Sequence, residues 1–254
     1  MKRQDSRKMD TTLEADTNDD GAKIHDVVTD DIVAVIPAYQ EANEVGRVVA
    51  QVQQHGLPVL VVDDGSTDDT ASRARDAGAT VLQQPSNRGK GASLRAGFRW
   101  ALEREFAAIL TLDADGQHDP REIPRFLEAR AASAPDLLIG ARDFNQMPWT
   151  RYTTNMVGRW TLSWVMGEEM RDNQSGYRLL SRRMARASLD SDETGYEFEV
   201  EMIVICKQRD YALAWVPIRT IYNGERSHIN HLQHIYNYAR LLWRVRQQIK
   251  AGEG

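Results

Sequence analysis

Two aspartates one residue apart, Asp113 and Asp115, are the side chains of this sequence best placed to do chemistry. They follow an uncharged apolar run at 107–112, which predicts a buried strand. Because side chains alternate along extended backbone, the two carboxylates can project the same way. Carboxylates this close repel each other, and a shared proton or a divalent cation relieves the repulsion. The pair predicts an Mg²⁺ or Mn²⁺ site that also takes substrate phosphate oxygens; the alternative is an acidic turn that caps the next helix.

Strands alternate with helices through the first 140 residues, and this order positions the acids. Such alternation predicts a parallel α/β sheet with right-handed crossovers. Apolar runs predict the strands, and apolar residues three or four apart predict the helices. The predicted strands cover 32–36, 57–62, 80–82, 107–112 and 136–140, and the helices cover 42–55, 67–77, 87–104 and 119–132.

Polar loops follow three of these strands. They lie at 37–41, 63–66 and 113–117, after the first, second and fourth strands. In a parallel sheet, ligands bind at the carboxyl ends of the strands. We therefore expect the three loops to converge on one crevice.

The second half of the chain begins with a segment rich in Trp and Met at 144–166. A strand at 178–181, a helix at 195–208 and a strand at 212–217 follow, and 231–250 forms a basic amphipathic helix. No internal repeat or Gly/Ser linker is present. We expect one domain over 32–254, preceded by a disordered acidic tail at 1–31 that holds nine Asp/Glu and five Lys/Arg.

Composition narrows the class of protein. The net charge of −5 argues against a general nucleic-acid binder. The single cysteine, Cys206, cannot form an internal disulfide and suggests a small core residue in a reducing compartment. No apolar run reaches the length of a transmembrane helix or a secretory signal, which favours a cytoplasmic location.

Five short motifs occur in a defined order, at 35–41 (VIPAYQE), 61–68 (VVDDGSTD), 87–91 (NRGKG), 113–118 (DADGQH) and 174–178 (QSGYR). Each is weak alone, but the ordered set is specific. The sequence resembles the family 2 inverting glycosyltransferases, and within them the dolichol-phosphate mannosyltransferase-like branch, over roughly residues 32–230. The resemblance implies a GT-A fold and sugar transfer from a nucleotide diphosphate sugar of the GDP-mannose or UDP-glucose class.

The resemblance also implies donor-site roles. Tyr39 can lie against a nucleobase, and Glu41 can accept from a ribose hydroxyl or from a base N–H. Asp64 matches an acid that accepts from a nucleobase N–H, although Glu41 and Asp64 could instead be acids near helix N-termini. Lys90 could neutralise a phosphate or be an exposed lysine. The implied nucleotide-sugar site is Pro37, Tyr39, Glu41, Asp64, Lys90, Asp113, Ala114 and Asp115, and the implied metal ligands are Asp113, Asp115 and Gln117.

The acceptor side offers cations. A phosphate monoester is already an anion near pH 7, since its second pKa is about 6, so it needs cations and no general base. Arg142 follows a predicted strand, and Arg151 and Asn155 share one face of a helix. The family has Arg, Arg and Ser at these acceptor-phosphate positions, so Asn155 is a departure. The alternative is salt bridges from the arginines to Asp143 or Glu168.

A further cation, Arg219, and the stretch 224–228 fall where the family has a mobile loop over the diphosphate. A closing cation there would stabilise the leaving nucleotide diphosphate. The resemblance thus makes Asp115, Arg142 and Arg219 the expected catalytic residues.

Aromatic, Met and Arg side chains at 144–166, with the basic C-terminal helix, suit a membrane interface. The predicted acceptor is a polyprenyl phosphate, and the enzyme is expected to be peripheral at the inner face of the membrane. A core or dimer interface is the alternative. Family members often carry C-terminal membrane helices, so a membrane-protein partner or a homo-oligomer stays open.

Two other functions fit the same residues. A hydroxyl acceptor, on a glycan or small molecule, would need a general base, for which Glu197, Glu199 and Asp192 are the candidates. A nucleotide-sugar-binding regulator without transferase activity is the third hypothesis, against which the intact Asp113 and Asp115 argue.

Overall fold

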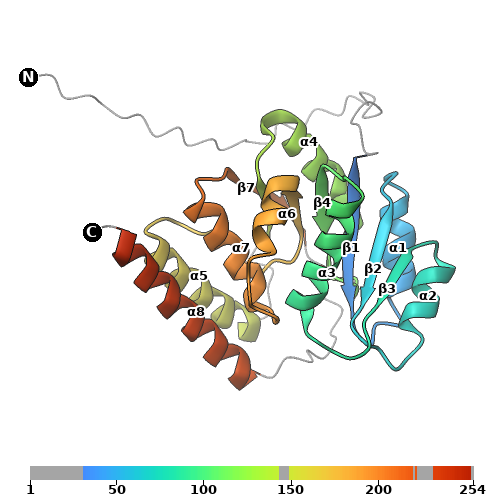
Figure 1. The fold of residues 1–254 in the computed structure, drawn as a ribbon, viewed down its shortest axis with the longest axis horizontal. Helices are drawn as coiled ribbons and strands as arrows, with labels where there is room; N and C mark the ends of the chain where they lie inside the picture. Colours follow the sequence, from blue (N-terminus) through green and yellow to red (C-terminus); the bar gives the residue numbers. More distant parts are fainter. Residues whose placement is uncertain (1–30, 143–148, 220, 222–230, 253–254) are drawn as a thin grey trace, which may run out of the picture.

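The structure, a computed structural model, describes residues 31–142, 149–219, 221 and 231–252. For 149–155, 231–236 and 248–252 it describes the backbone alone. Helices cover both faces of a seven-stranded sheet with the order β3-β2-β1-β4-β6-β5-β7 (Figure 1). Its strands are β1 Ile32–Ala38, β2 Val59–Asp63, β3 Thr80–Gln83, β4 Ala108–Thr111, β5 Leu137–Arg142, β6 Arg178–Ser181 and β7 Leu213–Ile218.

The sheet is mostly parallel, which confirms the predicted fold class. β1 pairs in parallel with β2 on one side and with β4 on the other. The pairs β2–β3 and β5–β7 are also parallel. β6 is inserted between β4 and β5 and runs antiparallel to both. The carboxyl ends of β1, β2 and β4 therefore lie at one edge, where the three polar loops were expected to meet.

The predicted helices are present with shifted boundaries, whereas α5, within the Trp- and Met-rich segment, and α6 were not among them. The short helix α6 was not predicted; Ser181 begins it by accepting a hydrogen bond from Met184 N at 3.2 Å. The helices are α1 Val45–Gln53, α2 Thr70–Asp76, α3 Lys90–Glu103, η1 Pro120–Glu122, α4 Ile123–Ser133, α5 Trp149–Met166, α6 Arg182–Ser188, α7 Glu197–Gln208 and α8 His231–Gly252.

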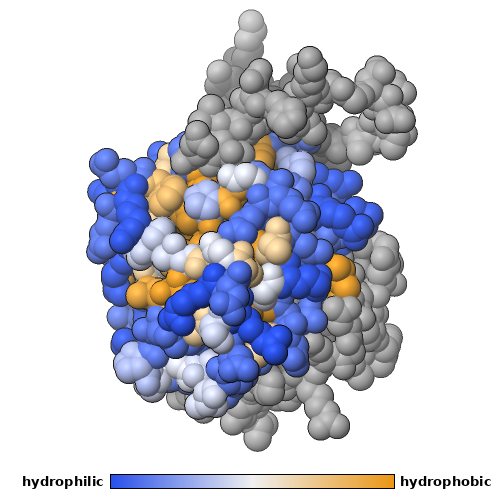
Figure 2. Space-filling view, turned by 90° about the vertical axis from the view of Figure 1, so that its right-hand side faces the viewer, coloured by the Kyte–Doolittle hydropathy of each residue, from blue (hydrophilic) through white to orange (hydrophobic). Residues whose placement is uncertain are grey.

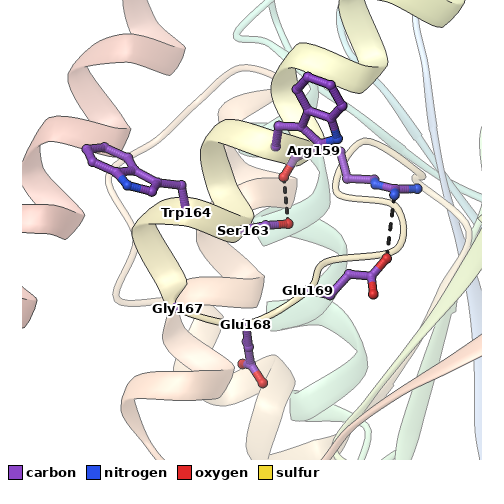
Figure 3. Close-up of a pocket in the computed structure, with 7 residues that line it drawn as sticks. Arg159, Ser163, Trp164, Gly167, Glu168 and Glu169 are labelled. Carbon is purple, nitrogen blue, oxygen red and sulfur yellow. Dashed lines mark hydrogen bonds and ion pairs between the residues drawn. The ribbon is translucent and has the colours of Figure 1, made fainter.

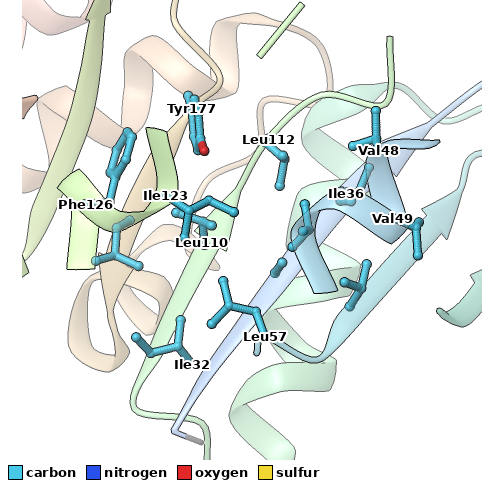
Figure 4. Close-up of a cluster of buried hydrophobic side chains, with 14 of the residues drawn as sticks. Ile32, Ile36, Val48, Val49, Leu57, Leu110, Leu112, Ile123, Phe126 and Tyr177 are labelled. Atoms are coloured by element: carbon cyan, nitrogen blue, oxygen red, sulfur yellow. The ribbon is translucent and has the colours of Figure 1, made fainter. Parts of the chain in front are cut away.

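Two apolar cores form on the two sides of the sheet. Ile32, Ala34 and Ile36 of β1 join the core beneath α1 and α4 (Figure 4), and Val33 and Val35 join the core beneath α3, α6 and α7. β1 is uninterruptedly apolar because both of its faces are buried. These cores hold the strand ends, and hence the polar loops, in fixed positions.

α5 and α8 lie side by side (Figure 1), and Tyr238 of α8 donates to the Gly158 carbonyl of α5 at 2.6 Å. Leu241 and Val245 of α8 are buried, as predicted for the apolar face of that helix. By contrast, the end of the molecule at α1, α2 and β3 is mostly hydrophilic (Figure 2). None of the helices, over the residues described, has the length and apolar character needed to cross a membrane.

Candidate active site

The loops after β1 and β2 are bound to each other. Gln40 N donates to Ser66 Oγ at 3.0 Å, and Asp64 N donates to the Ala38 carbonyl at 2.8 Å. Gln40 has a φ of +59°, which turns the chain sharply after Tyr39. The Tyr39 side chain is 38% exposed, so that its ring is available to a ligand.

Glu41 and Pro37 lie two residues to either side of Tyr39 in the chain. The Glu41 backbone N donates to Thr70 Oγ1 at 2.8 Å, and Pro37 is buried in β1 opposite Val62. Because Thr70 and Asp68 hold the backbone at 41–42, α1 begins at Val45 and not at the predicted residue 42. Glu41 therefore lies in a turn before α1 and does not cap it.

Asp64 fixes the start of α3. It is 4% exposed, and its carboxylate accepts from Arg88 N at 2.9 Å and Gly89 N at 2.8 Å. Gly89 has a φ of +93°, a conformation that favours glycine. Asp64 therefore connects the β2 loop to Lys90, the first residue of α3, while its predicted nucleobase contact remains a prediction.

Lys90 is buried between two carboxylates. Its Nζ lies 2.5 Å from Asp113 Oδ1 and 2.9 Å from Glu199 Oε1, and 5.5 Å from the centre of the Tyr196 ring. Burial opposes its charge, but Asp113 and Glu199 raise the pKa of Lys90 above its ordinary value. The alternative of an exposed lysine is therefore wrong.

His118 supports Asp113 from the other side. Asp113 N donates to His118 Nδ1 at 3.0 Å, so the neutral ring carries its proton on Nε2. Burial lowers the pKa of His118 to about 4. Burial alone would raise the pKa of Asp113, but Lys90 and then His118 hold it below its ordinary value.

Asp115 closes the turn that presents the acids. Gln117 N donates to Asp115 Oδ1 at 2.9 Å, and Gly116 between them has a φ of +72°. Burial, and then in part the charges of Asp113 and Asp115, raise the pKa of Tyr196. Both carboxylates therefore lie within electrostatic reach of the Tyr196 hydroxyl. Ala114, between them, is buried in the apolar core.

Gly176 forms the wall of this cluster. A Cβ at Gly176 would lie 2.6 Å from Glu199 Oε1, 2.8 Å from Lys90 Nζ and 3.1 Å from Asp113 Oδ1. Buried Arg178 holds the segment in place, since its Nε donates to the Ser175 carbonyl at 2.8 Å and its Nη1 to the Glu199 carbonyl. The motif at 174–178 thus has glycine where a side chain would displace the charged groups. The sequence pointed to this motif but did not reveal that role.

These residues fit a divalent cation. With Asp172 included, the four acids Asp113, Asp115, Asp172 and Glu199 carry four formal negative charges against three on Lys90, Arg142 and Arg178, so an excess of negative charge remains for a cation. Lys90 Nζ itself occupies a cation position on Asp113 Oδ1. Within the described ranges no three His, Cys, Asp or Glu side chains group as a metal site. The predicted set, two carboxylates and the Gln117 amide oxygen, suits an ion that takes its other ligands from water and substrate.

Arg142, at the end of β5, pairs with Asp172. Arg142 Nε lies 2.7 Å from Asp172 Oδ2 and Nη2 lies 2.9 Å from Oδ1. The predicted alternative partners were Asp143, which lies outside the described residues, and Glu168, which pairs with Lys207. The positive charge of Arg142 also contributes to the low pKa of Asp113, so Arg142 lies within electrostatic reach of the acid pair.

The other predicted cations lie on α5 and after β7. Arg151 and Asn155 lie on α5, but their side chains lie outside the described ones. Arg219 is exposed, and its Nε donates to buried Glu122 Oε1 at 2.8 Å. Ile221 N donates to the Gln117 carbonyl at 3.0 Å, which ties the segment after Arg219 to the acidic turn. The stretch 224–228 lies outside the described residues.

Of the three candidate bases, Glu199 is the one in contact with the cluster. It is 3% exposed, Glu197 is buried at the start of α7, and Asp192 is exposed. The sequence alone gave no reason to separate them.

A surface hollow lies away from this cluster. It has a volume of about 470 Å³ at the end of α5, where Arg159, Trp164 and Glu169 are among its lining residues (Figure 3). It contains none of the predicted donor-site residues. We therefore base the active site on the polar cluster and not on this hollow.

Comparison with known families agrees with this assignment. A family model described as "Glycosyl transferase family 2" matches residues 33–192. The chain belongs to glycosyltransferase family 2. The predicted family and enzyme class are thereby confirmed, and the matched span includes the Tyr39 loop, Asp64, Lys90 and the acid pair.

The relatives of this glycosyltransferase include enzymes with named activities. It is 31% identical to a polyprenol monophosphomannose synthase of Mycolicibacterium smegmatis, over 73% of this chain and 76% of the relative. It is 32% identical to an undecaprenyl-phosphate mannosyltransferase of Micrococcus luteus, over 74% of this chain and 82% of the relative.

The glycosyltransferase also resembles a solved structure in fold. Glucosyl-3-phosphoglycerate synthase of Mycobacterium tuberculosis, in complex with Mn²⁺, UDP-glucose and phosphoglyceric acid, superposes with a TM-score of 0.72 and 19% identity. The similarity covers 91% of this chain and 86% of that one. The predicted GT-A fold is confirmed.

Proposed function

We propose that this glycosyltransferase moves a hexose, mannose or glucose, from a nucleoside diphosphate sugar to a polyprenyl phosphate, with Mg²⁺ or Mn²⁺. The observation that carries the proposal is the cluster at the strand ends. There Lys90 contacts Asp113, and the loops after β1 and β2 are hydrogen-bonded to each other. Both named relatives are enzymes of polyprenyl phosphates or polyprenols. Mn²⁺ and UDP-glucose are present in the structure of the fold relative.

The donor would lie across the three loops. Tyr39 would lie against the nucleobase and Glu41 would accept from the ribose, with Asp64 and Pro37 shaping the same loop. Asp113, Asp115 and Gln117 would hold the metal ion, which when bound supplies positive charge beside the leaving diphosphate. Lys90 is the protein's own cation at the same place and would bind a phosphate oxygen.

The acceptor would bring its own nucleophile. A phosphate monoester oxygen attacks the anomeric carbon as the bond to the diphosphate breaks, and no proton has to be removed. Arg142, oriented by Asp172, would hold the acceptor phosphate together with Arg151 and Asn155 of α5. Arg219 would approach the diphosphate. To do so, its guanidinium must leave the ion pair with Glu122 and bind the substrate instead.

In this proposal the enzyme works at the cytoplasmic face of the membrane that holds its acceptor. We define the aromatic–arginine surface as Val157, Trp160, Trp164, Trp243 and Arg246. Its three Trp side chains are 64–66% exposed, and the Arg246 guanidinium stacks 4.0 Å above the Trp164 ring. Neither α5 nor α8 contains an Asp or a Glu. Arg240 and Arg244 of α8 pair with Glu193 and Glu201 of neighbouring segments, whereas Arg246 contacts Trp164. Exposed Trp beside arginine is the composition expected for binding an anionic lipid surface.

The experiment that tests the function is a panel of nucleoside diphosphate sugars with Mg²⁺ or Mn²⁺. Product is measured with undecaprenyl phosphate and, separately, with free sugars as acceptors. We expect transfer to the polyprenyl phosphate that EDTA abolishes and that the Asp115→Asn variant lacks. Transfer to hydroxyl acceptors alone would support the alternative function and contradict this one.

A further inference from the structure

Glu199 is a buried acid that the proposed reaction does not use. Its side chain is 4% exposed, and its Oε1 atom makes no hydrogen bond among the described residues. Lys90 Nζ lies only 2.9 Å away, close enough for an ion pair but poorly directed for a hydrogen bond. A buried carboxylate oxygen with this unused capacity is costly to keep, unless another state of the site uses it.

Lys90 is shared unequally between its two partners. Its Nζ is closer to Asp113 Oδ1, at 2.5 Å, than to Glu199 Oε1. Asp113 is one of the proposed metal ligands, so a divalent cation on its carboxylate would lie beside the ammonium and repel it. Metal binding would therefore favour movement of the buried ammonium toward another negative partner within a short distance.

The surroundings limit where that ammonium can go. Gly176 closes one side of the cluster, and the Tyr196 ring lies 5.5 Å from Nζ. An ammonium has three donors and a flexible stem, so a small movement would direct it fully at Glu199. Arg178 holds the backbone carbonyl of Glu199, which keeps the first turn of α7 and its carboxylate in place.

We propose that Glu199 is a positioning residue, which takes over Lys90 when a divalent cation binds Asp113. The metal ion then displaces the ammonium without leaving it unpaired, and Lys90 stays beside the diphosphate site. The inference rests on the proposed metal-dependent function. It assigns to Glu199 a role that acts through Lys90, in contrast to a general base, which would act on the acceptor itself.

The test measures Mn²⁺ binding, in the presence of UDP or GDP, by electron paramagnetic resonance of free Mn²⁺. Four proteins form a double-mutant cycle: wild type, Glu199→Gln, Lys90→Met and the double variant. We expect Glu199→Gln to weaken Mn²⁺ binding roughly 5- to 50-fold, because Lys90 then keeps Asp113, and Lys90→Met to tighten it. In the Lys90→Met background, Glu199→Gln should change the affinity by no more than about twofold.

Glu201→Gln is the matched control, since Glu201 lies on the same helix but bonds to Ser191 and Arg244. It should leave Mn²⁺ binding unchanged. An equal loss from Glu199→Gln in both backgrounds would overturn the inference, because Glu199 would then act independently of Lys90. Loss of transfer with unchanged Mn²⁺ affinity would also overturn it and indicate a general base.

A second measurement does not depend on any variant. In a crystal structure of the wild type with Mn²⁺ and UDP, Lys90 Nζ should lie on Glu199 and away from Asp113. If Lys90 still contacts Asp113 while a metal ion is bound, the inference about Glu199 is overturned but the proposed function is not. A wild type that binds no Mn²⁺ with any nucleotide would overturn the metal-dependent function as well.

Discussion

Asp172 holds the guanidinium of Arg142 through two parallel hydrogen bonds, of 2.7 and 2.9 Å. The same carboxylate accepts from Gln174 N at 3.1 Å and Ser175 N at 3.2 Å. It therefore fixes Arg142 relative to the loop that leads to Gly176 and the acid cluster. Such a two-pronged pair orients a cation more strictly than a single contact does.

We predict that Asp172→Asn weakens binding of the acceptor and not of the donor. With one charge lost, the Arg142 guanidinium is no longer held in a single orientation for the acceptor phosphate. The acceptor KM should rise roughly 10-fold, with the donor KM within about twofold of wild type. Arg142→Lys should act in the same direction because lysine cannot form the paired contact.

Arg183→Lys is the control for that experiment. Arg183 makes a comparable pair with Asp136, but its side chain is 63% exposed and lies on α6. It should leave both KM values unchanged. Equal rises in the donor and acceptor KM after Asp172→Asn would contradict the assignment of Arg142 to the acceptor.

Gly176→Ala should abolish most activity while the protein still folds. The added Cβ would come within 2.6–3.1 Å of Glu199, Lys90 and Asp113 and push the charged groups apart. Overpacking of this kind costs about 1–3 kcal/mol of stability, which thermal unfolding would measure. Gly46→Ala is the control. Gly46 lies within α1, and the nearest atom to a Cβ added there would be 3.5 Å away. The Gly46→Ala variant should be as active and as stable as the wild type. Similar losses of activity in both variants would rule out a clash of the added Cβ with the charged cluster as the cause.

His118 should make the metal-free protein less stable in acid. Its pKa is about 4 in the folded protein and about 6.5 in the unfolded chain. Between these values the unfolded state binds the additional proton, so stability falls as the pH is lowered from 6.5 towards 4. His118→Asn keeps an acceptor for Asp113 N but does not titrate there. Chemical denaturation in EDTA at several pH values should show a shallower pH dependence for this variant, and parallel curves would refute the prediction.

The sequence predicted the parts of the site that follow directly from strand ends. The loops at 37–41 and 63–66 meet through Gln40 and Ser66, and Asp64 reaches the start of α3, because parallel strands bring their carboxyl ends to one edge. β6 was predicted with its observed bounds, but its antiparallel direction was not, since an apolar run does not encode the direction of its partner. α6 was missed because it is short and follows β6 without a loop.

Long-range packing explains the remaining differences. Glu199 meets Lys90 across more than a hundred residues, and Asp172 meets Arg142 across thirty. In the sequence Glu199 is one of three glutamates in the predicted helix at 195–208, and no local pattern distinguishes it from the other two. The choice of ion-pair partner depends on how α7 packs against α3 and β6, which local patterns do not specify.

The aromatic–arginine surface should bind anionic vesicles through its tryptophans. We predict that replacing Trp160, Trp164 and Trp243 by Ser lowers partition into phosphatidylglycerol vesicles roughly 10- to 100-fold at low salt. Arg246→Ser should weaken the binding less and reduce its dependence on salt, since it removes one charge. Co-sedimentation with vesicles measures both effects. Arg73→Ser, at an exposed position on α2, is the control and should bind as the wild type does.

Acceptors in a membrane and in solution distinguish a role of the aromatic–arginine surface in membrane binding from a role in catalysis. The triple Trp variant should lose transfer to undecaprenyl phosphate in vesicles but retain transfer to a short, water-soluble prenyl phosphate, because the acid cluster is unchanged. If the surface instead joins two copies of the chain, the triple variant would alter the mass measured by light scattering and leave vesicle binding intact. That result would exclude a lipid partner, since the same tryptophans cannot be buried in a dimer and inserted among lipid headgroups at once.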